Sequence, residues 1–424
     1  MSPPSLDYIA PGPALGSYAE GFEPVARAFA AQLQKSEIGA GYTVYQHGRC
    51  VVDLWGGLAD RDSGRAWERD TAIVLFSVTK GLASMAMHHL AQRGKLDFDA
   101  PVSSYWPGFA RGGKGAITVG TLMSHRAGLA ALDTPMTLDD CVNPERADFV
   151  REALEVQAPT WVPGTRQGYH GLTFGMYVRE LFEQITGESM GAYLRRELWE
   201  PLGADVWLGA PSDVDDRVAT LYPPTNGERA RNYGLRLFGQ PRSPEARIAR
   251  SVVRPESLAR RAFLNPATGP GGIGRYNDVD VRRAELAWAS AVGTADGVAR
   301  AYLPFAQQGA HDGRRYFDPD RIAILHERRS WSHRDAVIQK PLGWTLGFLK
   351  EQGTVFSPNR ESFGHTGIGG ALGWCDPVAG ISLGYTLNRM DWRVRSPRSI
   401  ALSRALYRCE PVRRAIEDAR DRAA

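Results

Sequence analysis

The distribution of strand and helix patterns constrains the fold most: strands occur near both ends of the chain, and helices fill the middle. GYTVYQHGRCVVDLWGG (residues 41–57) forms two short strand-like runs around His47-Gly48, which predicts a β-hairpin. Strand patterns return between residues 343 and 389, in GWTLGFLKE, ESFGHTG, GALGWCD and ISLGYTLNR. Because no helical pattern separates these later runs, they predict a largely antiparallel sheet.

The middle of the chain, from about residue 97 to 290, predicts helices joined by long loops rich in proline and glycine. Within it, residues 225–284 have weak periodicity and much Arg, Pro and Gly, so irregular loops over a cleft, or partial disorder, are expected there. Further helices are predicted over 23–35, near 291–308 and in the C-terminal RSIALSRALYRCEPVRRAIEDARD.

These elements together predict an α+β fold with an antiparallel sheet flanked by helices. Residues 1–90 and 290–424 are expected to form one discontinuous sheet domain. Residues 91–289 would form a mainly helical inserted domain, with the active site in the cleft between the two.

Composition excludes several classes of function. The 43% hydrophobic and 23% charged content is ordinary for a globular protein, and the net charge of +4 comes from dispersed arginines, so no nucleic-acid site is expected. The N-terminus lacks the features of a signal peptide and no stretch reaches 18 apolar residues, which predicts a cytoplasmic protein without a membrane span. The four distant cysteines predict reduced thiols, and the nine histidines lack metal-ligand spacing, so no metal is expected.

A candidate nucleophile lies at the start of a predicted helix. Ser77 is expected to be its N-terminal cap, and Lys80 stands where a capping box would place Glu or Gln. Because positions i and i+3 share a helix face, the Lys80 amine can reach the Ser77 hydroxyl and accept its proton. A plain cap followed by an exposed lysine explains the segment equally well.

Two other motifs are not expected to carry chemistry. Gly380-Ile381-Ser382-Leu383-Gly384 matches the G-x-S-x-G nucleophile elbow, but the surrounding alternation places Ser382 inside a strand. Gly269, Gly271 and Gly274 match G-x-G-x-x-G without a preceding strand or following helix, so no dinucleotide site is predicted.

With Ser77 and Lys80 identified, the chain resembles the serine β-lactamase and penicillin-binding protein superfamily from about residue 40 to 395. It is most similar to class C-like β-lactamases and family VIII carboxylesterases. Tyr169, in GYHGLTFG, resembles the second sequence box, and His365-Thr366-Gly367 resembles the third, with His in place of Lys. Supporting segments are LMSHRAGL (122–129), TGESMGAYLRRELWEPLG (186–203) and SAVGTADGVARAYLPFAQQG (290–309).

The resemblance implies roles for these positions. Ser77 would be the acylated nucleophile, with Lys80 and Tyr169 as its general base system, and which of the two is the base stays open. The oxyanion hole would use the backbone N–H groups of Ser77 and Ile368. His365, Gly367 and the aromatic Trp374 would contribute to substrate binding, and Trp344 would help to set substrate preference. No cofactor is implied.

Two departures from the β-lactamase pattern bear on the substrate. Gly171 replaces the Asn that would bind the side-chain carbonyl of a lactam, and His365 replaces the Lys that would pair with a carboxylate. Uncharged substrates therefore fit better, and the expected function is a serine carboxylesterase for small acyl esters.

Other functions on the same residues stay open at this point. Acyl transfer, amide or peptide hydrolysis and weak β-lactamase activity use the same acyl-enzyme. A non-catalytic acylated sensor is an alternative of another class. The physiological substrate and the oligomeric state do not follow from the sequence.

Overall fold

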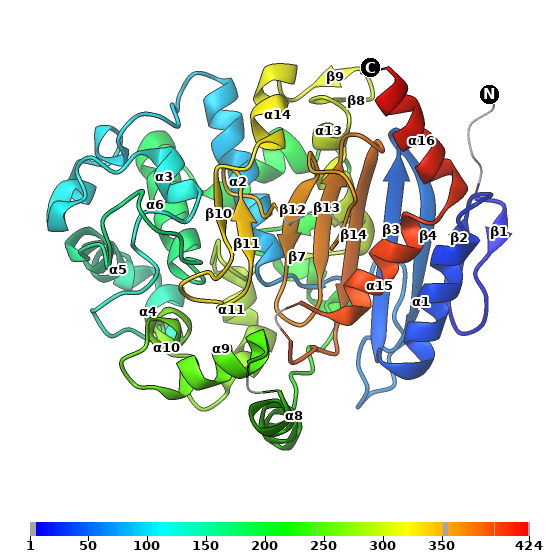
Figure 1. Ribbon diagram of the computed structural model, residues 1–424, viewed down its shortest axis with the longest axis horizontal. Helices are drawn as coiled ribbons and strands as arrows, with labels where there is room; N and C mark the ends of the chain where they lie inside the picture. Colours follow the sequence, from blue (N-terminus) through cyan, green and yellow to red (C-terminus); the bar gives the residue numbers. More distant parts are fainter. Residues whose placement is uncertain (1–5, 241, 351–354, 394, 423–424) are drawn as a thin grey trace.

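The core of the protein is a seven-stranded sheet in which every neighbouring pair is antiparallel, as predicted. The computed structural model describes residues 6–240, 242–350, 355–393 and 395–422 (Figure 1). In spatial order the strands are β1 (Tyr8–Ile9), β2 (Leu15–Tyr18), β4 (Arg49–Gly57), β3 (Gly39–Gln46), β14 (Ile381–Leu387), β13 (Leu372–Asp376) and β12 (Phe363–Thr366). Pairing of β3 with β14 joins strands from the two ends of the chain.

The predicted hairpin is confirmed as β3 and β4. His47 (φ 49°) and Gly48 (φ 80°) both take positive φ at its turn, which suits the twist of a two-residue β-hairpin.

Helices cover both faces of this sheet. In Figure 1, α1 (Glu23–Lys35), α15 (Pro397–Leu406) and α16 (Glu410–Asp421) lie in front of it. On the opposite face, α12 (Ala295–Ala301) packs on β14 and β3. A Cβ at Gly384 of β14 would lie 2.1 Å from the Ala295 carbonyl oxygen, so only glycine allows this close approach of helix to strand.

The remaining helices lie mostly to the left of the sheet in Figure 1. They are α3 (Val119–Met123), α4 (Leu138–Val142), α5 (Ala147–Val156), α6 (Thr173–Thr186), α7 (Met190–Leu194), α8 (Asn226–Gly239), α9 (Pro244–Val253), α10 (Leu258–Leu264), α11 (Val279–Arg283), α13 (Leu303–Ala306) and α14 (Pro319–His326). Two short hairpins pair β8 (Ala310–His311) with β9 (Arg314–Arg315) and β10 (Ser330–Ser332) with β11 (Leu342–Trp344).

A small second sheet ties distant parts of the chain together. Its order is β5 (Ile73–Val74), β7 (Val292–Gly293) and β6 (Val206–Trp207). The segment that leads into α2 (Val78–Gln92) therefore pairs with β7, where the chain returns to the main sheet, and β7 in turn pairs with β6 of the helical middle of the chain. The division into two domains stays a prediction.

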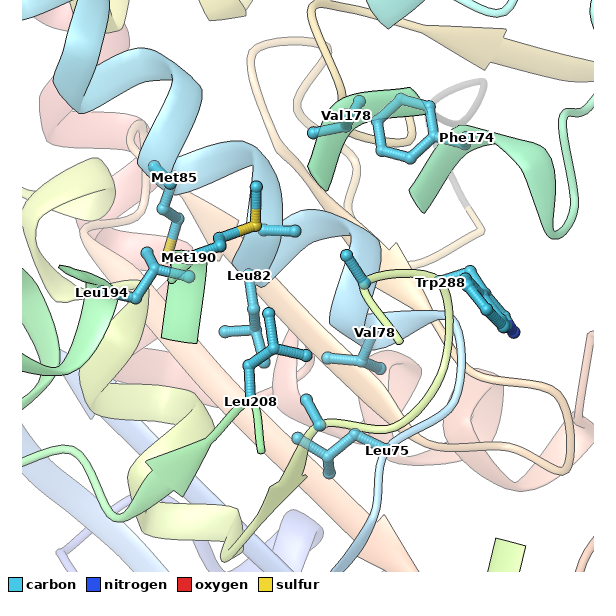
Figure 2. Packing of buried hydrophobic residues seen from close by; sticks show 14 of the residues in the cluster. Leu75, Val78, Leu82, Met85, Phe174, Val178, Met190, Leu194, Leu208 and Trp288 are labelled. Atoms are coloured by element: carbon cyan, nitrogen blue, oxygen red, sulfur yellow. The ribbon is translucent and has the colours of Figure 1, made fainter. Parts of the chain in front are cut away.

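Helix α2 is buried on all sides. Figure 2 shows Leu75, Val78, Leu82 and Met85 packed with residues that include Phe174, Val178, Met190, Leu194, Leu208 and Trp288. Such a helix is a central core element and not an amphipathic surface helix. Every residue from 71 to 91 is buried except Ser77, which is half-buried.

The expectation of irregular loops over 225–284 is wrong, because α8, α9, α10 and α11 lie in this range. Two of these helices, α9 and α10, begin at ordinary capping signals: the Ser243 hydroxyl accepts from the Ala246 N–H, and the Ser257 hydroxyl accepts from the Arg260 N–H. Local caps thus mark the starts of α9 and α10, in a stretch whose many arginines leave few apolar residues to indicate a helix.

All four cysteines are free thiols, with Cys375 and Cys409 buried and Cys50 and Cys141 half-buried. Within the ranges that the structure describes, no helix is long and apolar enough to cross a membrane.

Candidate active site

Ser77 lies at the sharp turn that leads from β5 into α2. The preceding residue, Phe76, has φ 47°, a left-handed conformation that costs a non-glycine residue about 1–3 kcal/mol and is typical of functional sites. Its ring packs on Tyr276, with the ring centroids 5.1 Å apart. This turn leaves the Ser77 side chain as the accessible point of an otherwise buried segment.

The Ser77 hydroxyl is not a helix cap, contrary to the expectation from its position. It makes no capping hydrogen bond. Instead, its Oγ lies 3.1 Å from Lys80 Nζ and accepts a hydrogen bond of 2.9 Å from the Tyr169 hydroxyl. The structure thus brings the three predicted catalytic residues into direct contact, although Tyr169 is 92 positions from Ser77 in the chain.

Lys80 is an amine in a fully buried position. Its Nζ donates a hydrogen bond of 2.8 Å to the Trp288 carbonyl, and the side chain has no measurable exposure. Burial lowers the pKa of Lys80 well below its usual value, because desolvation disfavours the charged ammonium. A neutral amine carries a lone pair, so it can accept the proton of the Ser77 hydroxyl.

Tyr169 is held from several directions. Its ring stacks on Trp344 with centroids 5.4 Å apart and planes within 1° of parallel, and Lys80 Nζ lies 5.3 Å from its ring centroid. The Tyr169 backbone N–H donates to the buried Asp335 carboxylate at 3.1 Å. Burial raises the pKa of the Tyr169 hydroxyl, so this group is a proton donor and not a phenolate.

Asp335 organises the loop that supports Tyr169. Besides the Tyr169 N–H, its carboxylate accepts hydrogen bonds from the backbone N–H groups of Val337 and Ile338 and from the Gln167 side-chain amide. A buried carboxylate with this many donors fixes the geometry of the surrounding loop.

His365 lies on β12 beside these groups, with its ring centroid 6.3 Å from that of Tyr169 and 5.5 Å from that of Trp344. Its Nδ1 is 2.9 Å from the Thr366 carbonyl oxygen, while the buried Nε2 has no hydrogen-bond partner among the described residues. Burial, with Lys80 close by, lowers the pKa of His365 to about 3. At neutral pH this ring therefore carries no positive charge.

The turn after β12 approaches the segment before Ser77. A Cβ at Gly367 would lie 2.6 Å from the Leu75 carbonyl oxygen, so only glycine fits at this position. The next residue, Ile368, is 43% exposed, and neither its N–H nor that of Ser77 donates to any other described residue. The two segments that meet here thus each carry a backbone donor without an acceptor among the described residues.

Trp374 is not part of this arrangement. Its neighbour on β13, Gly373, faces Val78 and Tyr302, and alternation along the strand places Trp374 on the opposite side of the sheet. There it is buried against the Phe356 ring, with centroids 5.3 Å apart. The expectation that Ser382 lies inside a strand is confirmed, since it is a buried residue of β14.

Residues that the sequence did not indicate complete the site. Phe263 of α10 lies beside Gly171: a Cβ there would be 2.9 Å from the Phe263 ring, whose centroid is 6.5 Å from that of Tyr169. The Trp288 carbonyl and Asp335 likewise act through tertiary contacts and belong to no recognisable motif. In the part of the chain that the structure describes, no three His, Cys, Asp or Glu side chains are grouped to hold a metal ion.

The chain is similar to known proteins over most of its length. The family model described as Beta-lactamase matches residues 25–406. Esterase/beta-lactamase LipL of Mycobacterium tuberculosis is 33% identical over 382 residues, which cover 87% of this chain and 81% of LipL. Esterase EstB of Burkholderia gladioli is 26% identical, over 89% of this chain and 92% of EstB.

Among solved structures, one described as a family VIII carboxylesterase superposes with a TM-score of 0.80 and 31% sequence identity. The superposition covers 93% of this chain and 99% of that structure.

Proposed function

We propose that this chain, which belongs to the beta-lactamase family, hydrolyses small uncharged carboxylic esters through an acyl-Ser77 intermediate. The chain is a serine ester hydrolase, the class of the esterases that it resembles. One observation supports the proposed acyl-Ser77 mechanism. The half-buried Ser77 hydroxyl lies between the buried Lys80 amine, 3.1 Å away, and the Tyr169 hydroxyl, 2.9 Å away. This is the arrangement that activates a serine nucleophile.

In the first step, Ser77 Oγ attacks the ester carbonyl while a base removes its proton. We assign the base to Lys80, because burial lowers the pKa of Lys80 and raises that of Tyr169. The lowered pKa favours the neutral Lys80 amine, which can accept a proton, whereas forming the Tyr169 phenolate would be costly. The hydrogen bond from Lys80 to the Trp288 carbonyl keeps the amine beside Ser77.

The tetrahedral intermediate carries a negative oxygen that needs donors. The N–H groups of Ser77 and Ile368 supply them, and a preorganised donor of this kind contributes about 3 kcal/mol to transition-state stabilisation. The Tyr169 hydroxyl, already bonded to Ser77 Oγ, then relays a proton to the leaving alkoxide. Attack of water on acyl-Ser77 completes hydrolysis.

The surroundings of Tyr169 favour uncharged substrates. His365 is neutral at pH 7, so it offers no cation to a substrate carboxylate. The Phe263 ring fills the space beside Gly171, where an amide side chain would contact a lactam. An apolar group replaces a polar one at this position, which suits a simple acyl ester.

The proposal is tested by comparing turnover of p-nitrophenyl acetate, p-nitrophenyl butyrate and nitrocefin by the purified protein. We expect multiple turnovers of both esters, with kcat/KM at least about 100-fold above that for nitrocefin, because a lactam would lose two polar contacts. A single burst of p-nitrophenol without turnover would contradict hydrolysis and indicate an acylated sensor. Faster turnover of nitrocefin would make the chain a β-lactamase.

Phe263 is expected to limit the size of the acceptable ester. Phe263→Ala should raise kcat/KM for p-nitrophenyl octanoate relative to the acetate by about 10-fold, since removal of a ring from an apolar pocket is worth a few kcal/mol at most. The matched control is Leu264→Ala, because Leu264 is the next residue on α10 and is 47% exposed. An unchanged chain-length profile in Phe263→Ala would remove Phe263 from the substrate site.

A further inference from the structure

A surface pocket lined almost entirely by arginines lies where α9 meets the loop between β10 and β11. Its volume is about 450 Å³, and the residues that line it are Arg242, Arg247, Arg250, Ser251, Arg254 and Arg334. Positions 247, 250, 251 and 254 are spaced i, i+3, i+4 and i+7, so they share one face of α9 and its C-terminal end. No residue of the candidate active site lines this pocket.

Three of the arginines that line the pocket are not neutralised by a carboxylate in the part of the protein that the structure describes. None of the described residues that line it is a carboxylate, and the one acidic side chain of α9, Glu245, lies 2.7 Å from Lys340 Nζ. Across the described residues, Arg247, Arg254 and Arg334 form no ion pair. Like charges this close repel one another, so the free protein loses stability by gathering them here.

Hydrogen bonds orient the guanidinium groups without neutralising them. Arg247 donates from its two terminal nitrogens to the carbonyls of Arg242, at 2.5 Å, and Gln339, at 3.0 Å. Arg334 Nε donates to the Gln339 side-chain oxygen at 2.6 Å. Arg247 Nε is buried and has no hydrogen-bond partner among the described residues. The pocket is therefore built from positioned donors, and one donor is left without an acceptor.

We propose that this pocket is a binding site for a small anion that carries phosphate groups. Planar guanidinium groups match phosphate oxygens with paired hydrogen bonds, and several such groups on one wall suit a ligand with more than one negative charge. Binding would reduce the repulsion between the arginines. The volume admits a diphosphate or a phosphorylated small molecule.

Inorganic pyrophosphate is the probe, with binding measured by isothermal titration calorimetry in 50 mM NaCl. We expect saturable binding to the wild-type protein and about 10-fold weaker binding to Arg247→Gln and to Arg254→Gln. Arg247→Lys, which keeps the charge but not the planar donor pair, should lie in between. Arg413→Gln on α16, an exposed arginine far along the chain, is the matched control and should bind as the wild type does.

Ser77→Ala should also bind pyrophosphate with wild-type affinity, which separates this pocket from the candidate active site. Circular dichroism of each variant checks that it is folded. Equal weakening by Arg413→Gln, unchanged affinity in both glutamine variants, or no binding to the wild type at 1 mM pyrophosphate would overturn the proposal. Tighter binding of single-stranded DNA, lost in Arg254→Gln, would also overturn it, by assigning the pocket to nucleic acid.

Discussion

Ser77→Ala is expected to lower kcat for p-nitrophenyl butyrate by at least about 10⁴-fold, because loss of the nucleophile removes covalent catalysis as a whole. The residual rate would come from the two backbone donors and Lys80 acting on water. The fold should persist, since Ser77 is half-buried and makes no capping hydrogen bond. The measurement is steady-state kinetics, with intact-protein mass spectrometry of the acyl-enzyme after rapid acid quenching.

Ser382→Ala is the matched control for this prediction. Ser382 belongs to the chain's G-x-S-x-G sequence, yet it is buried in β14, and its hydroxyl has no hydrogen-bond partner within the described structure. Its removal therefore leaves no donor or acceptor unpaired, and kcat should stay within about 2-fold of wild type. Equal rates for wild type and Ser77→Ala would refute the assignment of the nucleophile. If the acyl adduct were lost only in Ser382→Ala, the nucleophile would be Ser382 of β14 and not Ser77.

Lys80→Met is expected to lower kcat by about 10³-fold, within the range that general base catalysis contributes. The protein should nevertheless be at least as resistant to heat as the wild type, because an unbranched apolar side chain replaces a desolvated amine in a buried helix. Kinetics and thermal unfolding at pH 7 measure both effects. Wild-type activity in a folded Lys80→Met protein would exclude Lys80 as the base.

The lowered pKa of Lys80 also sets the pH dependence. Activity should rise with pH and level off well below pH 10.5, as the amine becomes neutral. In the pH range between the pKa of Lys80 in the folded protein and its higher value in the unfolded chain, the unfolded state binds more protons. The free energy of unfolding should therefore increase with pH across this range, and Lys80→Met should remove that contribution. A pH profile of kcat tests the predicted rise in activity. Urea unfolding at several pH values tests the predicted increase in the free energy of unfolding.

The fold was largely predictable because its signals are local. The hairpin around His47-Gly48 and α1 lie where their patterns indicated, and the α+β fold of the β-lactamase superfamily is confirmed by the sheet and by the family match. The prediction failed over 225–284, where α9 and α10 begin at serine caps. An apolar stripe is a strong signal only when one face of a helix is buried and the other exposed.

The sequence by itself determined the chemistry of one helical turn: the S-x-x-K spacing places a serine and a lysine on the same face of α2. Only the tertiary structure decided that Lys80 is buried against the Trp288 carbonyl, that Tyr169 reaches Ser77, and that Trp374 lies on the far side of the sheet. The reason is physical. Spacing fixes geometry within a few residues, whereas desolvation and long-range contacts come from packing of distant segments, such as those of Lys80 and Trp288, which are 208 positions apart.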